Sequence, residues 1–187
     1  MMFHRTSRNT AAEKFHPYQK LILWLGLLII MVAGNWAIYQ KESILSEGQS
    51  VLLPLLPRDP RSLLQGDYMQ LRLQLSQDIA YQLKQGGESA LQAEDGLVAI
   101  TIDEHNVGQF SALVTKEHVE DLEQPFLRYR KRGDNYRIAS DAFFFEEGTG
   151  AFFAQARYAE VKFNRHGDAL ITHLYDADLK RLAGPAR

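Results

Sequence analysis

The chain has 187 residues and a formal net charge of −2, a length typical of one folded domain with an additional segment. Residues 40–187 contain 17 Lys and Arg against 22 Asp and Glu, a net charge of −5, which argues against nucleic acid or an anionic lipid surface as their partner. The absence of cysteine excludes zinc–thiolate sites and a cysteine nucleophile.

An uncharged segment, residues 21–39, lies near the N-terminus. As a helix it spans roughly 28 Å, about the thickness of the hydrocarbon core of a bilayer. A buried core helix is one alternative, but the segment lacks a polar face of helical period. A cleaved signal peptide, with Val32 and Gly34 before the cut, is the other. The apolar run continues to Ile38, which favours an uncleaved transmembrane helix in the lipid bilayer.

The charges that flank this segment predict its orientation. Arg5, Arg8, Lys14 and Lys20 precede it against the single acidic residue Glu13, and no cluster of positive charge follows it. By the positive-inside rule, the N-terminus is cytoplasmic and residues 40–187 lie outside. The predicted regions are a cytoplasmic tail (1–20), a transmembrane helix (21–39), a linker (40–50) and an outer domain (51–183).

The outer part begins with a strand and a proline-rich turn. Residues 40–50 form either a linker or a continuation of the helix. Residues 51–56 are predicted to form a strand, in which Pro54 requires an edge position or a break. Asp59 followed by Pro60 is a helix-start signal, which predicts a single helical turn there.

Gly66 and Asp67 then turn the chain into a segment of strict alternation, residues 68–75. Its apolar residues share one face, and these are Met69, Leu71, Leu73 and Leu75. The other face is polar or aromatic, with Tyr68, Gln70, Arg72 and Gln74. This period of two predicts a half-buried strand.

The rest of the domain is predicted to contain short helices and hairpins. Helices are expected over 76–85, with Ile79 and Leu83 inward, and over 151–158, with Phe152 inward. Three hairpins join 97–102 to 110–115, 126–131 to 135–138, and 160–164 to 169–174. Residues 176–183 are expected to form a helical turn or short helix. The fold class is therefore α+β, with a mainly antiparallel β domain after one transmembrane helix.

Two blocks of sequence resemble a known family. The first block contains Pro57, Asp59, Pro60, Arg61, Leu63, Leu64, Gly66, Asp67, Tyr68 and Leu71, and the second contains Phe144, Glu147 and Gly148. With the strand–glycine–strand ending at 159–174, they make the chain similar to the GDYXXLXY family of membrane-anchored bacterial proteins, over roughly residues 45–180. Two positions depart from the family pattern, because Leu73 replaces a tyrosine and Glu146 a proline.

The resemblance implies an anchor in the bacterial inner membrane and a periplasmic or other extracytoplasmic domain of uncharacterised function. It also implies a partner, because members of the family often accompany polytopic membrane proteins. Leu73 lies on the apolar face of the predicted strand, so a tyrosine there would be a packing residue. The change at this position weakens any idea that it has a chemical role.

The charged motif residues allow two interpretations. Asp59, Arg61, Asp67 and Glu147 would form one pocket if they act as metal ligands or as an acid–base pair. Alternatively they stabilise turns, with Asp59 capping, Gly66 at a positive φ and Arg61 paired to a carboxylate. We favour turns, because each residue stands where a turn is needed. The candidate binding or interface positions are Asp59, Pro60, Arg61, Gly66, Asp67, Tyr68, Leu71, Glu147 and Gly148.

Other residue patterns carry weaker signals. The outer histidines (His105, His118, His166 and His173) lack the spacing of a zinc site and are expected to be isolated at the surface. Ser62 and Lys162 would suit a serine–lysine hydrolase, but no matching motif accompanies them. Tyr68 is expected to be a packing residue on the solvent side of its strand, with a partner surface as the alternative. The run Phe143–Phe145 is expected to be buried, with a patch for lipid headgroups or a partner as the alternative.

We therefore expect a non-enzymatic accessory subunit, without cofactor or metal, that docks on a polytopic membrane protein. The alternative is a ligand-binding or sensing module that uses Asp59, Arg61, Asp67 and Glu147. A membrane-anchored hydrolase is less favoured.

Overall fold

The computed structural model describes residues 17–56, 68–86, 95–114, 119, 122–140, 142–146 and 148–183. The chain forms two compact units, Met1–Lys41 and Glu42–Arg187. All strands lie in the second unit. The predicted α+β class is confirmed, since one long apolar helix precedes mostly antiparallel sheets and short helices.

Helix α1 (Pro17–Glu47) contains the predicted membrane segment. Residues 18–47 are long and apolar enough to cross a membrane, and the large apolar side chains of residues 21–32 are exposed all round, as lipid contact requires. Asn35 is the polar exception within the span. Its side-chain Nδ2 donates to the carbonyl of Met31 at 2.8 Å, which satisfies the amide inside the helix.

The last turn of α1 belongs to the second unit. Ile44 is buried, and its carbonyl accepts a hydrogen bond from the Gly48 N–H at 3.0 Å. A Cβ atom on Gly48 would collide with that carbonyl and lie 3.1 Å from the carbonyl of Phe163. Only glycine therefore fits where the helix meets β1.

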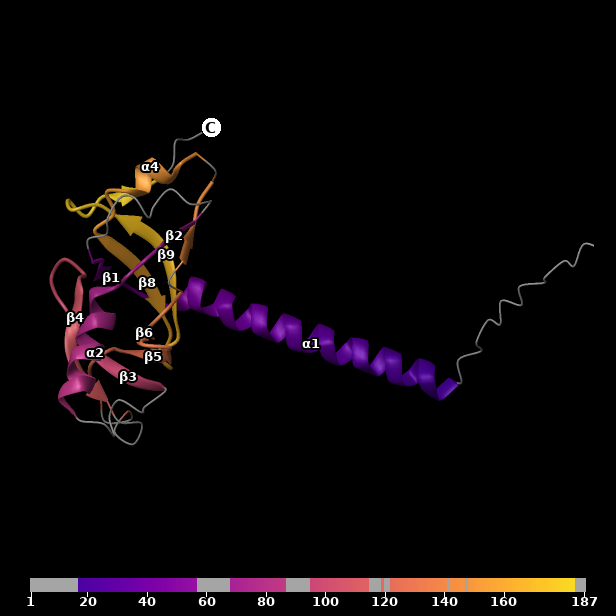
Figure 1. Ribbon diagram of the computed structural model, residues 1–187. Coiled ribbons are helices and arrows are strands. Elements are labelled where there is room, and N and C mark those ends of the chain that lie inside the picture. Colours follow the sequence, from indigo (N-terminus) through magenta and orange to yellow (C-terminus); the bar gives the residue numbers. More distant parts are fainter. Residues whose placement is uncertain are drawn as a thin grey trace, which may run out of the picture. The chain divides into compact units, whose positions relative to one another are not determined.

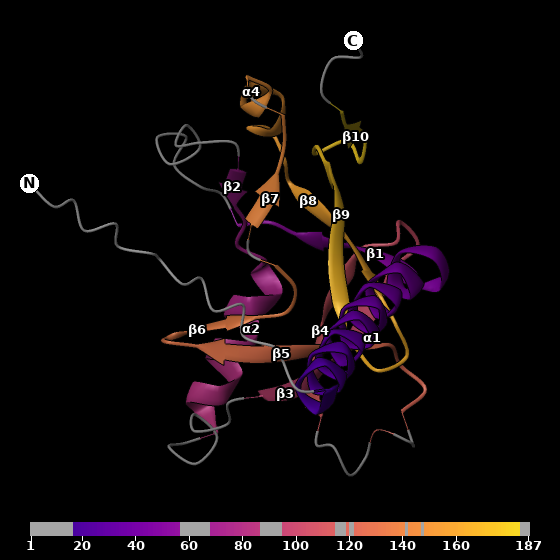
Figure 2. The same cartoon turned by 90° about the vertical axis from the view of Figure 1, so that its right-hand side faces the viewer.

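Ten strands of the described residues form three sheets, in which every strand pair is antiparallel (Figures 1 and 2). The first sheet has the order β1 (Gln49–Pro54), β8 (Tyr158–Phe163), β9 (Ala169–Tyr175), β10 (Arg181–Leu182). The second has the order β4 (Gly108–Val114), β3 (Asp95–Ile102), β5 (Phe126–Arg132), β6 (Asn135–Arg137). A small ribbon pairs β2 (Tyr68–Gln70) with β7 (Ala142–Phe144).

The three predicted hairpins are present, and their turns contain residues in the left-handed region. Asn106 (φ 62°) lies between β3 and β4, Gly133 (φ 58°) between β5 and β6, and Gly167 (φ 79°) between β8 and β9. Strand β1 is an edge strand and ends at Pro54, as expected for a residue that cannot donate to the sheet.

The predicted strand over 68–75 is wrong in length but correct in burial. Only 68–70 form β2, and Leu73 forms a single bridge with Leu55. Helix α2 (Gln74–Gln85) then begins two residues before its predicted start. The four apolar positions of the alternation are all buried, and Leu75 reaches the core from the inner face of α2.

Two predictions near the C-terminus are wrong. The expected helix over 151–158 is the single turn α4 (Gly150–Phe153), and β8 already begins at Tyr158. Pairing of β8 with both β1 and β9 outweighs the weak helical preference of an alanine-rich segment. The expected helical turn over 176–183 is a turn followed by β10.

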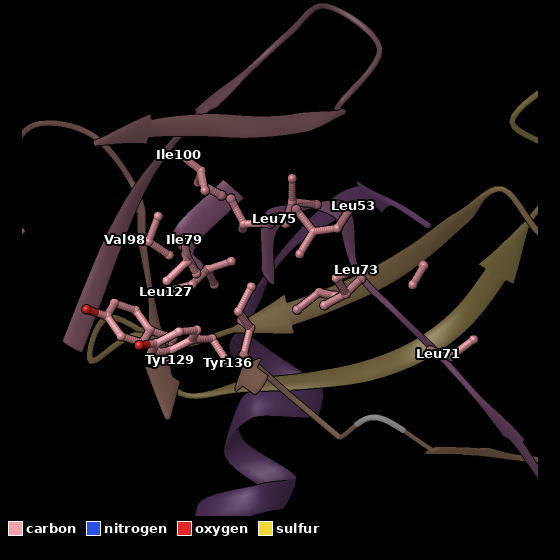
Figure 3. Close-up of a cluster of buried hydrophobic side chains, with 14 of the residues drawn as sticks. Leu53, Leu71, Leu73, Leu75, Ile79, Val98, Ile100, Leu127, Tyr129 and Tyr136 are labelled. Atoms are coloured by element: carbon pink, nitrogen blue, oxygen red, sulfur yellow. The ribbon is translucent and has the colours of Figure 1, made fainter. Parts of the chain in front are cut away.

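The main core lies between α2 and the sheets (Figure 3). Leu75 and Ile79 of α2 point toward Val98 and Ile100 of β3, and Leu53 of β1 joins them. Leu83 is also buried, which confirms the predicted inner face of this helix.

Candidate functional site

The ribbon of β2 and β7 joins the two sequence blocks that carry the family resemblance. In its register Tyr68 is opposite Phe144, Met69 opposite Phe143, and Gln70 opposite Ala142. Figure 2 shows the two short strands side by side. Segments far apart in the sequence therefore form one local structure.

The two faces of this ribbon differ. Tyr68 and Phe144 lie on the outer face with exposed fractions of 42% and 73%. Their ring centroids are 5.9 Å apart, and the rings are tilted by 44°. Met69, on the inner face, is buried. Because side chains alternate across a strand, the register that buries Met69 places the Tyr68 and Phe144 rings together at the surface.

Phe153 supports the inner face of this ribbon. Its ring centroid lies 5.4 Å from that of Phe143, in an edge-to-face arrangement, and 5.4 Å from that of Phe145, which is stacked on it. The prediction that Phe152 faces inward is wrong, because Phe152 is 45% exposed and Phe153 only 7%. A single helical turn leaves room for only one of the two neighbouring rings to point inward.

The motif residues that the structure describes, apart from Tyr68 and Phe144, lie in the core or in a turn. Leu71 is buried, and Gly148 has a φ of 81°. Next to Gly148, Thr149 donates twice to the carbonyl of Glu146, from its N–H at 3.0 Å and its Oγ1 at 2.6 Å. This geometry is that of a tight turn. The remaining candidate positions lie outside the described residues, and these are Asp59, Pro60, Arg61, Gly66, Asp67 and Glu147.

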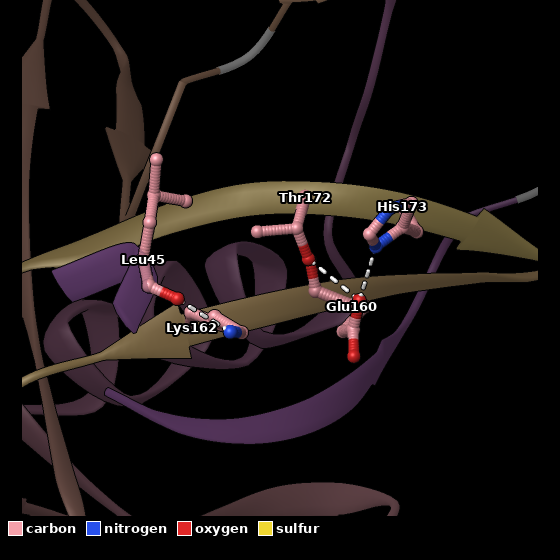
Figure 4. Close-up of polar contacts among 5 residues, drawn as sticks. All are labelled: Leu45, Glu160, Lys162, Thr172 and His173. Carbon is pink, nitrogen blue, oxygen red and sulfur yellow. Dashed lines mark hydrogen bonds and ion pairs between the residues drawn. The ribbon is translucent and has the colours of Figure 1, made fainter. Parts of the chain in front are cut away.

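Glu160, Thr172 and His173 form a polar cluster on β8 and β9 that the sequence did not predict (Figure 4). Glu160 Oε2 accepts a hydrogen bond from Thr172 Oγ1 at 2.6 Å and lies 2.6 Å from His173 Nδ1. The prediction that His173 is isolated is therefore wrong. His173 lies opposite Glu160 because the register shifts between Glu160 and Val161, and counting residues from the turn does not predict this shift.

The neighbours of Glu160 control its ionisation. Burial raises the pKa of this carboxyl, but hydrogen bonds from Thr172 and His173 and the charges of His173 and Lys162 lower the pKa by more. The net pKa is below the ordinary value of 4.5. The carboxylate therefore stabilises the hairpin as an anion.

Glu160→Gln is expected to lower the free energy of unfolding by about 1.5–3 kcal/mol at neutral pH, the range for hydrogen bonds to a charged group. Because the folded pKa lies below the unfolded one, this contribution is complete above pH 4.5 and disappears as pH falls through the folded value. Urea titrations of both proteins at several pH values measure the difference. A difference that stays constant on acidification would contradict this assignment.

The side chain of Lys162 binds the C-terminal end of helix α1. Its Nζ donates to the carbonyl of Leu45 at 2.6 Å, in the last turn of α1, where a cation is favoured by the helix dipole. Its proposed partner Ser62 lies outside the described residues. Within the described ranges, no group of three or more His, Asp and Glu side chains is placed to hold a metal ion.

Comparisons with known proteins agree with the two motif blocks. Searches of curated proteins and of solved structures each gave no match to this chain. The family model described as "GDYXXLXY protein" matches residues 30–174, which include α1 from residue 30, the β2–β7 ribbon and the hairpin of β8 and β9. The chain therefore belongs to the GDYXXLXY family.

Proposed function

We propose that this protein is a membrane-anchored accessory subunit that docks on an integral membrane protein. Its α1 remains uncleaved in the bacterial inner membrane, with the N-terminus cytoplasmic and the folded domain periplasmic. The docking surface is the outer face of the β2–β7 ribbon, formed by Tyr68 and Phe144. The pairing of these two exposed aromatic residues from the two motif blocks carries the proposal.

The anchor supports the membrane part of the proposal. Helix α1 is long and apolar enough to span a bilayer, and the basic residues before it favour a cytoplasmic N-terminus. A domain held by one such helix diffuses in the plane of the membrane. Its frequent neighbours are therefore other membrane proteins, which fits a subunit of a membrane complex.

The ribbon supports the docking part. Tyrosine and phenylalanine are enriched in the cores of protein interfaces, and an isolated exposed phenylalanine is less informative than a contacting pair. The contact between the two rings, 5.9 Å between centroids, therefore supports the docking part of the proposal.

The proposal is tested by photocrosslinking in intact cells. Benzoylphenylalanine placed at Phe144 is expected to give a discrete adduct with one membrane protein. The matched control is the same group at Tyr81, an aromatic residue of α2 that is 61% exposed. Mass spectrometry identifies the proteins that are crosslinked from each position. Equal adducts from both positions, or none from Phe144, would contradict the proposal.

The two other hypotheses lack an observation in their favour. The ligand-binding module depends on Asp59, Arg61, Asp67 and Glu147, and the hydrolase on Ser62, all outside the described residues. The aromatic ribbon, in contrast, gives the accessory subunit a physical basis, because it brings together two exposed rings from the two motif blocks.

A further inference from the structure

A groove of about 370 Å³ lies beside the segment that follows the motif tyrosine. Its apolar lining includes Leu71 and Leu73, together with Tyr136 after the turn of β5 and β6. All three residues are buried, so they hold the chain segments around the groove in place. Its volume is at the lower end of the range of small-molecule sites.

The rim of this groove is basic. Arg72 lies between the two leucines of the lining, Lys84 comes from the end of α2, and Arg137 comes from β6. Asp134 is the one acidic residue among the lining residues. This excess of positive charge lies on a region, residues 40–187, whose net charge is −5. The groove is therefore a local exception to the charge of its surroundings.

Two of these cations lack a side-chain partner among the described residues. Arg72 and Lys84 are exposed, and within the part of the chain that the structure describes their side chains make no ion pair or hydrogen bond. Arg72 lies in the link between β2 and α2, Lys84 lies in α2, and both line the groove. An anion between them would gain charge-assisted hydrogen bonds from both.

We propose that this groove binds a small organic anion that has an apolar part and at least two negative charges. A carboxylate or phosphate lies against Arg72 and Lys84, where arginine binds two oxygens at once and lysine acts as a point charge. The apolar part lies against Leu56 and Ala80, two half-buried apolar residues that line the groove. This site is separate from the docking face, because it does not use Tyr68 or Phe144.

The test uses the full chain in nanodiscs of zwitterionic lipid, with calorimetric titration of phenyl phosphate, phthalate and inorganic phosphate. Saturable binding of phenyl phosphate or phthalate is expected, and it identifies which acid group the site prefers. Inorganic phosphate is expected to bind at least about tenfold more weakly than phenyl phosphate, because it lacks the buried ring. Equal binding of these two, or no saturable binding of either organic anion, overturns the proposal.

Two double variants distinguish binding in the groove from a general effect of the protein's charge on affinity. Arg72→Gln with Lys84→Gln is expected to weaken binding about 100-fold, since each charge-assisted contact accounts for about tenfold. Arg165→Gln with Lys180→Gln, two exposed residues outside the groove, removes the same charge and should leave the affinity within about twofold. Circular dichroism checks that both variants fold. Equal weakening in the two pairs would overturn the site.

Discussion

Replacing Phe153 by alanine is expected to lower the free energy of unfolding of the outer domain by about 3–5 kcal/mol, the usual cost of removing a buried aromatic ring. The ring of Phe153 contacts those of Phe143 and Phe145, with both centroid distances at 5.4 Å. The substitution leaves a cavity under β7 and removes two aromatic contacts. Urea titration of the full chain in detergent, followed by circular dichroism, measures the loss.

Phe152→Ala is the matched control for this prediction. Phe152 is the preceding residue of the same turn but is 45% exposed, so its removal should change the unfolding free energy by about 0.5 kcal/mol or less. An equal loss from the two substitutions would contradict the role of Phe153 in supporting the ribbon. Both tryptophans lie in α1, which is why circular dichroism is preferred to tryptophan fluorescence.

The largest part of the fold could be predicted from local sequence patterns. The three hairpins followed from turn residues such as Asn106, Gly133 and Gly167 between alternating segments, because few residues adopt a positive φ. The membrane segment followed from its length and lack of charge. Such signals depend on neighbouring residues and need no knowledge of tertiary contacts.

The errors arose where tertiary pairing decides the structure. Residues 151–158 have a helical composition, yet pairing with β1 and β9 makes a strand from Tyr158 onward. In the same way, residues 71–75 keep the burial of a strand while Gln74 already begins a helix. Period-two alternation reports which side chains are buried more reliably than it reports hydrogen bonding.

The candidate site could be predicted only in part from the sequence. The resemblance identified Tyr68 and Phe144 as motif residues, but their pairing depends on the register of two strands distant in the chain. Phe153 was missed because the choice between two adjacent phenylalanines depends on the phase of one helical turn. The basic groove could not be predicted because its three cations come from three separate parts of the chain, namely the link between β2 and α2, helix α2 and strand β6.

Docking through the ribbon predicts that Tyr68→Ala with Phe144→Ala separates the protein from its partner without unfolding it. Loss of even one interface hot spot costs about 2 kcal/mol or more, which is roughly a thirtyfold loss of affinity. Both residues are exposed, so the unfolding free energy should fall by about 1 kcal/mol at most. The control pair is Tyr81→Ala with Ile102→Ala, which removes two exposed apolar side chains outside the ribbon.

The most direct test is the amount of the protein crosslinked from Phe144 that co-purifies with each full-length variant from solubilised membranes. Quantitative mass spectrometry gives the ratio of partner to tagged chain. The ratio is predicted to fall at least about thirtyfold for the ribbon pair and to stay at the wild-type value for the control pair. An unchanged ratio for a folded ribbon variant would contradict the claim that Tyr68 and Phe144 form the docking surface.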